Sequence, residues 1–367
     1  MIRIGEVIFE KRTEKGLTQQ QIADYLNVTK ATISKWEKGY SYPDITLLPA
    51  IAAYFGITVD ALLRAKHEMT KEAIRQWYTH FTERFSQESY EEVLADVKRD
   101  QIIYYDDDNF LLQLAILRLN HIELAEDQQA ALQDIVQIVE RVEEITEDVW
   151  IRRQANVLVA TVALFMGKPD RTLERLAGSV RPVMGEEMLL AEAYEAKGEV
   201  EEAKKVVQSF LFQQLLGVIG SSTTYLRFIQ TDEWAFQETV ARIEAIIQAY
   251  KVEQLHPNVV LKSYYTVAQL SAFKQSEQQC RQYLTKYVHV IVTHLFPIQL
   301  SGDHYFSLLD EWFDTLDLGS NALRDPELVR KSIMQTFAHP AFEIYAESEW
   351  FSQLYEQLRQ LRKEENI

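Results

Sequence analysis

Cysteine occurs only once in the 367 residues, at Cys280. A single thiol excludes an intrachain disulfide, so a fold held together by disulfides is ruled out and a reducing compartment fits the chain. We interpret Cys280 as a small packing residue rather than as a nucleophile.

Glycine and proline are also scarce, with twelve and eight residues, and they fall mainly between segments of helical apolar periodicity. This distribution, without a convincing strand pattern after residue 70, predicts an all-α fold. The sequence has no glycine-rich phosphate loop, no His-Glu-x-x-His and no paired cysteines, so we expect a protein that is not an enzyme, with no cofactor and no metal site. The acidic run at residues 106–108 is interpreted as a helix start, which the helix dipole favours, rather than as a cation site.

Long apolar runs are missing too. The most apolar stretch, residues 157–166, contains Thr161 and is shorter than the ~20 residues that a membrane-spanning helix needs. The first six residues lead directly into a predicted helix without the pattern of a signal peptide. We therefore expect a soluble, cytoplasmic protein that has no membrane partner.

Positive charge is in deficit over the whole chain, whose formal net charge is −17. The deficit is uneven, because residues 1–66 hold nine Lys and Arg against seven Asp and Glu, a net charge of +2, while the remainder carries −19. A slightly basic head can bind phosphates locally. The acidic body should oppose non-specific adhesion to nucleic acid and steepen the salt dependence of binding.

Residues 17–39, LTQQQIADYLNVTKATISKWEKG, indicate two short helices joined by a tight turn. Thr18 and Gln21 have the spacing of a capping box at the start of the first helix, and Thr29 is placed to cap the second. Asn27, between the two, tolerates the left-handed conformation that a sharp turn needs. This stretch is the most informative in the chain.

The second of these helices is predicted to bury Ile33 and Trp36 and to turn small and polar side chains outward, which is the build of a helix that enters a DNA groove. The pattern GLTQQQIADYLNVTKATISKWEKGYSYPDITLLPAIAAYFGITVDALL resembles the phage repressor and Cro type of helix-turn-helix, known as the Xre family. The resemblance covers about the first 66 residues and implies a DNA-binding domain of five helices.

The resemblance also implies which side chains contact DNA. The expected DNA-binding residues are Gln19, Thr29, Lys30, Ala31, Thr32, Ser34, Lys35, Lys38 and Tyr40. Of these, Lys30, Ala31 and Lys35 are expected at base edges, where Lys can donate to guanine O6 and N7 and a methyl group can pack on thymine. Thr29, Thr32 and Ser34 are expected near the DNA backbone, and Gln19 is expected to brace a phosphate or a neighbouring side chain. Glu37 is expected to tie helices together.

The region from residue 70 onward shows one clear repeat signal. Tyr194, Gly198 and Ala203 have the tetratricopeptide spacing, in which an aromatic ring packs between two helices, a glycine turns the corner and a small residue lets the helices touch. A weaker copy is centred on Gly167, which lies 31 residues before Gly198 and so close to the ~34-residue period of that repeat. Further helices are predicted near residues 72–86, 90–100, 109–124, 128–145, 149–166, 233–250, 257–273, 277–295, 305–316, 325–337 and 342–363.

The predicted fold is therefore all-α, with an N-terminal five-helix helix-turn-helix domain followed by a tetratricopeptide-like helical-repeat solenoid. We place the DNA-binding domain at residues 1–66, a linker at 67–72, and the repeat domain, for sensing and dimerisation, at 73–367. Stacked helix pairs curve, and their concave side is an extended surface for a peptide or another protein.

A DNA-binding head followed by such a body resembles the peptide-sensing regulators of Gram-positive bacteria, the Rgg, PlcR and PrgX group. The resemblance implies a transcriptional regulator in quorum sensing, a homodimer that reads a pseudo-palindromic operator in double-stranded DNA and binds a short signalling peptide in its body. The alternative is a DNA-binding regulator whose repeat domain binds a regulatory protein or only dimerises.

Peptide contacts can be proposed from chemistry, because Asn amides hydrogen-bond a peptide backbone and Arg pairs with a carboxylate. The candidate peptide-binding residues are Asn120, Arg152, Arg153, Asn156, Lys262 and Tyr265. Arg152 and Asn156 are one helical turn apart and so share a face. For each candidate, a solvated face or a helix–helix hydrogen bond is the alternative interpretation.

Overall fold

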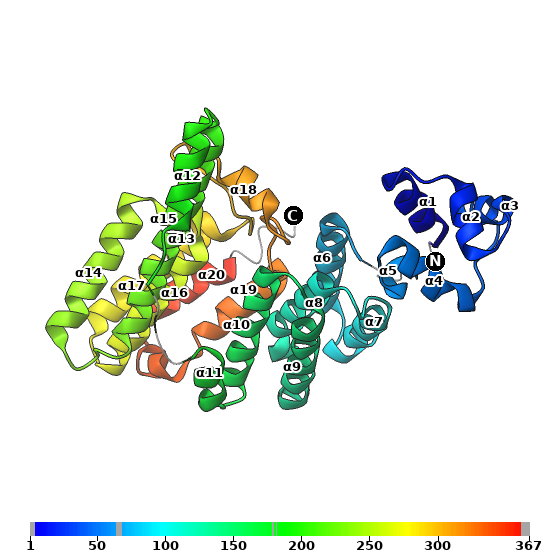
Figure 1. Cartoon of the computed structure of the whole chain (residues 1–367). Helices are drawn as coiled ribbons and strands as arrows, with labels where there is room; N and C mark the ends of the chain where they lie inside the picture. The colour runs from blue at the N-terminus through cyan, green and yellow to red at the C-terminus, as the bar shows by residue number, and fades with distance from the viewer. Residues whose placement is uncertain (1–3, 64–67, 178–179, 181, 361–367) are drawn as a thin grey trace.

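The computed structural model describes residues 4–63, 68–177, 180 and 182–360 (Figure 1). Within these residues the chain forms helices and no β-strand, which confirms the all-α prediction. No helix among them combines the length and the apolar character that crossing a membrane requires. The boundary predicted at residue 66 and the start of the linker at residue 67 lie outside the described residues.

The head, residues 4–63, is a five-helix domain with one additional 3-10 turn. Its elements are α1 (Ile4–Glu14), α2 (Gln19–Leu26), α3 (Lys30–Glu37), η1 (Ile45–Leu47), α4 (Leu48–Phe55) and α5 (Val59–Leu63). Ile8 and Ile33 are completely buried in its apolar core. Helix α1 packs very closely on α3, because a Cβ atom at Gly5 would lie only 2.0 Å from the carbonyl oxygen of Trp36.

The first half of the body is a stack of helical hairpins. Its elements are α6 (Lys71–Gln87), α7 (Tyr90–Ile103), α8 (Asp108–Asn120), η2 (Ile122–Leu124), α9 (Gln128–Ile145), α10 (Val149–Phe165) and α11 (Pro169–Arg175). Helices α6, α8 and α10 pack side by side, and α7 and α9 lie against α8. Thr70 caps α6 by accepting a hydrogen bond from the Ala73 amide, so the helix already begins within the range predicted for the linker.

The second half of the body has its own core. Its elements are α12 (Glu186–Ala196), α13 (Val200–Leu226), α14 (Glu233–Ala249), α15 (Val252–Leu255), α16 (Pro257–Phe273), α17 (Glu277–Val290), the π-helical turn η3 (Ile291–Leu295), α18 (Leu309–Thr315), α19 (Pro326–Thr336), η4 (Pro340–Tyr345) and α20 (Glu349–Gln360). The hairpin of α16 and α17 forms the centre of this half, with α13, α20 and η4 packed on it.

Both predicted glycine corners are present. Gly167 turns the chain between α10 and α11 with φ of +70°, and Gly198 does so between α12 and α13 with φ of +80°. The packing at the second corner differs from the prediction, because the Tyr194 ring is only partly buried and lies 5.7 Å from the Lys197 ammonium. Helix α12 instead buries Ala191.

The stacking of hairpins is interrupted after α11. In the described part of the body, α10 and α11 do not pack closely on α12 or α13. The two halves are joined instead by the end of α18 and the segment that leads from it to α19, which fold back on α6. The Arg75 guanidinium donates to the carbonyl oxygens of Asp314 (2.6 Å) and Asp317 (3.0 Å), and the Tyr78 hydroxyl donates to that of Leu323 (3.2 Å).

Two of the C-terminal helices begin or end at other residues than predicted. The helix expected at residues 305–316 begins only at Leu309, because the Asp303 carboxylate accepts hydrogen bonds from the amides of Tyr305 and Phe306 and holds that segment in a turn. The helix expected at residues 342–363 is divided, up to residue 360, into η4 and α20, and its expected last three residues lie outside the described part of the chain.

Candidate nucleic-acid interface

The turn between α2 and α3 is built from the local signals that the sequence predicts. The Thr18 hydroxyl accepts a hydrogen bond from the Gln21 amide (3.3 Å), and the Gln21 side chain accepts one from the Thr18 amide (2.8 Å), which completes a capping box. Asn27 has the left-handed φ of 54°. Thr29 caps α3 by accepting a hydrogen bond from the Thr32 amide (3.1 Å). These predictions are confirmed.

Helix α3 has an anchored inner face and a free outer face. Ile33 is fully buried and Trp36 is 4% exposed, and both pack in the core of the head. The side chains exposed on α3 and just beyond it are Thr29, Lys30, Ala31, Lys35, Lys38 and Tyr40, with Thr32 and Ser34 partly exposed. In the part of the head that the structure describes, none of the three lysines forms an ion pair. Their charge is therefore available to an external anion.

A buried ionic cluster fixes α3 relative to α1 and α2. The Glu37 carboxylate, 4% exposed, accepts hydrogen bonds from the Arg12 guanidinium (2.6 Å) and from the Gln19 amide (2.8 Å). Arg12 also donates to the carbonyl oxygen of Leu17 (3.0 Å). Glu37 thus ties helices together as expected, and Gln19 braces a neighbouring side chain. The sequence did not indicate Arg12, because it lies 25 residues from Glu37.

The predicted asparagines of the body bond within the fold. The Asn120 amide donates to the Tyr78 hydroxyl (3.0 Å), and the Asn156 amide donates to the carbonyl oxygen of Arg175 (3.2 Å). These are contacts between neighbouring helices, so the helix–helix alternative describes both residues.

The two predicted arginines on α10 are also engaged locally. Arg152 donates to the carbonyl oxygen of Thr146, and the Arg153 guanidinium lies 5.8 Å from the centre of the Trp150 ring. Neither of these two contacts involves Asn120 or Asn156.

Lys262 and Tyr265, both on α16, lie in different environments. Lys262 is exposed and lines a cavity of about 400 Å³. The Tyr265 hydroxyl instead donates to the carbonyl oxygen of Thr336 (3.2 Å), and its ring packs in the core. The preceding residue, Tyr264, faces another cavity, because successive residues of a helix point about 100° apart.

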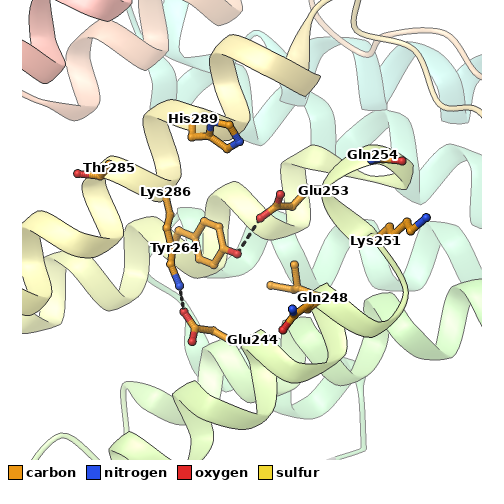
Figure 2. Close-up of a pocket in the computed structure, with 10 residues that line it drawn as sticks. Glu244, Gln248, Lys251, Glu253, Gln254, Tyr264, Thr285, Lys286 and His289 are labelled. Carbon is orange, nitrogen blue, oxygen red and sulfur yellow. Dashed lines mark hydrogen bonds and ion pairs between the residues drawn. The ribbon is translucent and has the colours of Figure 1, made fainter.

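That second cavity, of about 640 Å³, lies between α14, α15, α16 and α17 (Figure 2). Lys286 and Glu244 point toward each other and form an ion pair, and the Tyr264 hydroxyl donates to Glu253 (2.9 Å). Burial, together with the neighbouring carboxylates, raises the pKa of Tyr264, which therefore stays a neutral donor.

Other groups around this cavity are not used by the fold. Within the described residues, the side-chain amides of Gln248 and Gln254 have no hydrogen-bond partner, and the Lys251 ammonium forms no ion pair. His289 closes the wall on the side of α17 (Figure 2). The sequence missed this site, because its residues come from four helices and form no local motif.

The sequence matches to known proteins lie in the head. Residues 8–62 match the helix-turn-helix family. The chain is 39% identical over 69 residues to the HTH-type transcriptional activator BcrR of Enterococcus faecalis, a match that covers 19% of this chain and 34% of BcrR. It is 36% identical over 63 residues to the SPbeta prophage-derived uncharacterized HTH-type transcriptional regulator YonR of Bacillus subtilis (strain 168), covering 17% of this chain and 58% of YonR. The chain thus spans about a third of the first relative and somewhat more than half of the second.

Matches to two solved structures cover most of both chains. The competence regulator ComR from Streptococcus vestibularis, in its apo form, is 15% identical, with 86% of this chain and 98% of ComR covered and a TM-score of 0.27. PlcR of Bacillus thuringiensis, in complex with the peptide PapR7 and DNA, is 12% identical, with 100% of this chain and 99% of PlcR covered and a TM-score of 0.27. The sequence match and the geometry of α2 and α3 agree for the head: residues 8–62 form a helix-turn-helix domain of the Xre type.

Proposed function

We propose that the chain is a sequence-specific DNA-binding transcriptional regulator that acts in the cytoplasm. The observation that carries the proposal is α3, which is anchored by Ile33 and Trp36 while Lys30, Ala31 and Lys35 remain exposed. A helix held in this way presents its outer side chains to the base edges of a major groove. BcrR, which is similar to the head, is named as a transcriptional activator.

The DNA proposal is tested by selecting bound sequences from a random double-stranded library with the purified full chain. We expect enrichment of one motif and tight binding of that motif at low salt. Recovery of no common sequence would contradict sequence-specific binding, and indifference to every duplex at low ionic strength would contradict DNA binding altogether.

The regulator is proposed to act as a homodimer on a pseudo-palindromic operator, with its recognition helices about 34 Å apart. Trp150, Val157 and Leu164 support this, because they lie seven residues apart on α10, are each more than half exposed, and so form an apolar stripe on one helix face. A seven-residue apolar period suits the pairing of two helices. We name these residues the α10 stripe and propose that it packs against the same stripe of a second copy.

The oligomeric state is measured by light scattering after size exclusion. The Val157→Glu variant should be monomeric, because pairing would bury its carboxylate in an apolar contact. Ile344→Glu is the matched control, since Ile344 is similarly exposed but lies in η4. A monomeric parent protein would refute the homodimer, and a dimeric Val157→Glu variant would place the interface elsewhere.

A peptide is proposed to bind in the cavity of Figure 2. An extended peptide needs amide donors and acceptors along its backbone, which the unused amides of Gln248 and Gln254 supply, and groups of both charges at its ends, which the walls also hold. The volume of about 640 Å³ falls in the range of ligand sites. The sequence-predicted residues Asn120, Arg152, Arg153, Asn156, Lys262 and Tyr265 do not line this cavity.

The ligand is sought by native mass spectrometry of the protein incubated with culture extract. A bound short peptide, lost in the Gln248→Ala variant, would support the sensor. A stoichiometric protein partner would support the alternative of a protein-binding regulator. Operator affinity that does not respond to any extract would support a body that only dimerises.

A further inference from the structure

Another cavity in the body, formed by α7, α8 and α9, is lined by an unusual number of positive charges for its surroundings. The region after residue 66 carries a net charge of −19, yet this cavity of about 450 Å³ is lined by three cationic side chains and one carboxylate. The four are Lys98, Arg118, Arg141 and Asp134. The cavity is therefore cationic within an anionic body.

Arg118 is the centre of this site. It projects from α8, its side chain is 1% exposed, and it nevertheless lines the cavity. The only hydrogen bond of its side chain among the described residues runs from one terminal nitrogen to Asp134 and is long, at 3.3 Å, while its buried Nε has no partner. A guanidinium has five N–H donors, so this buried cation is left far from satisfied.

Asp134 does not neutralise the cluster. Burial disfavours its ionised form, but the hydrogen bond and charge of Lys98, whose ammonium lies 3.1 Å away, and the charge of Arg118 outweigh that effect and hold the pKa of Asp134 below its usual range. The carboxylate is thus ionised and shared by two cations. Arg141, whose own partner is the exposed Glu144 at 3.2 Å, adds a third positive charge at the rim.

The remaining wall is apolar and aromatic. Ile102, near the end of α7, and Tyr105, just after it, are both more than half exposed, and the Arg141 guanidinium lies 5.8 Å from the centre of the Tyr105 ring. Ile138 of α9 forms the apolar floor. Such a wall suits the flat, carbon-rich part of a small molecule.

We propose that this cavity binds a small organic anion, whose carboxylate or phosphate lies between Arg118, Lys98 and Arg141 and whose apolar part packs on Tyr105 and Ile102. An anionic group would supply the acceptors that the Arg118 guanidinium lacks. The site lies in the first half of the body, apart from the cavity of Figure 2 in the second half. It is a second ligand site beyond the proposed peptide.

Three probes test the proposal by isothermal titration of the full chain at low ionic strength: benzoate, phenyl phosphate and the neutral benzamide. We expect at least one of the two anions to bind about tenfold or more tightly than benzamide, because charge-assisted bonds to Arg and Lys are lost with the neutral probe. Preference for benzoate or for phenyl phosphate identifies a carboxylate or a phosphate ligand. Equal binding of all three probes, or no binding of either anion, would overturn the proposal.

Variants of the residues that line the cavity then test whether the anion binds there. The double change Lys98→Ala with Arg141→Ala removes two exposed cations and should weaken binding about tenfold or more, by the loss of two charge-assisted contacts. Arg99→Ala is the control, because Arg99 lies beside Lys98 on α7 but does not line the cavity. This change should alter the binding affinity less than about twofold. Arg118→Met should abolish binding, and its melting curve reports whether it folds. Unchanged affinity in the double variant would refute the site even if Arg118→Met fails to fold.

Discussion

Replacing Lys35 by alanine tests the proposed DNA surface directly. Lys35 is exposed on α3 and forms no ion pair in the described part of the head, so the core around Ile33 and Trp36 keeps its packing in the variant. The free energy of unfolding should therefore change by less than about 0.5 kcal/mol, as for other surface substitutions without partners. Any larger loss of DNA affinity then reports a lost contact to DNA.

The size of that loss depends on what Lys35 touches. A contact to a base edge is worth about 1–3 kcal/mol of discrimination, so a dimer that loses one in each half-site should bind its operator at least about 30-fold more weakly. A contact to a phosphate instead contributes about 0.9 to the slope of log affinity against log salt, so two heads would lose about 1.8 from that slope.

Fluorescence anisotropy of the selected operator between about 50 and 200 mM salt measures both quantities. Lys15→Ala is the matched control, since Lys15 is an exposed lysine that follows α1 and is not on α3. An affinity and a salt slope that are both unchanged in Lys35→Ala, or changed only as much as in Lys15→Ala, would show that α3 does not face the DNA.

The other predictions concern the interior. Gly5→Ala, which places a Cβ atom 2.0 Å from the Trp36 carbonyl oxygen, should destabilise the head by at least about 1–3 kcal/mol in chemical denaturation, whereas Gly217→Ala, in open space on α13, should stabilise the chain by about 0.5–1 kcal/mol. Cys280 is fully buried, and burial raises its pKa to about 12, so a thiol reagent should modify it only after denaturation; rapid modification of the native protein would contradict this burial. Burial lowers the pKa of His121 to about 4, below the unfolded value of about 6.5. The free energy of unfolding should therefore decrease as the pH falls from about 6.5 to about 4. Urea unfolding should give a free energy about 2 kcal/mol lower at about pH 5 than at about pH 7, and the same drop in His121→Phe would refute the assignment to this residue.

The head could be predicted closely because its signals are local. Thr18, Asn27 and Thr29 act on the backbone within three residues of themselves, so their spacing alone specifies two capped helices and a left-handed turn. The bond between Arg12 and Glu37 could not be predicted in this way, because its partners meet only after α1 and α3 have packed. Sequence reasoning therefore found the role of Glu37 through a family resemblance and missed its cation.

In the body, too, local features were predictable and contacts between distant residues were not. The corners at Gly167 and Gly198 were predictable, since a positive φ strongly favours glycine. The interruption after α11 and the return of the C-terminal segment to Arg75 were not, because contacts between residues some 240 positions apart leave no periodic trace in the sequence. The internal hydrogen bond of Asn120, one of the predicted ligand residues, was not predictable for a related reason: the group to which an Asn on a helix donates depends on the helix that packs beside it.

The packing of α19 constrains how a ligand in the body could influence the heads. A ligand can shift the spacing of two heads only through its different affinity for two arrangements of the bodies. Leu328, near the start of α19, belongs to the core of α6 to α10, whereas Ile333 of the same helix belongs to the core that contains α16 and α17. One helix is thus fixed at each end in a different half, and the segment before it is bonded to Arg75 of α6, the helix that follows the head along the chain. Packing contacts thus connect α16 and α17, which line the Figure 2 cavity, to α6 through α19 without passing the interrupted stack after α11.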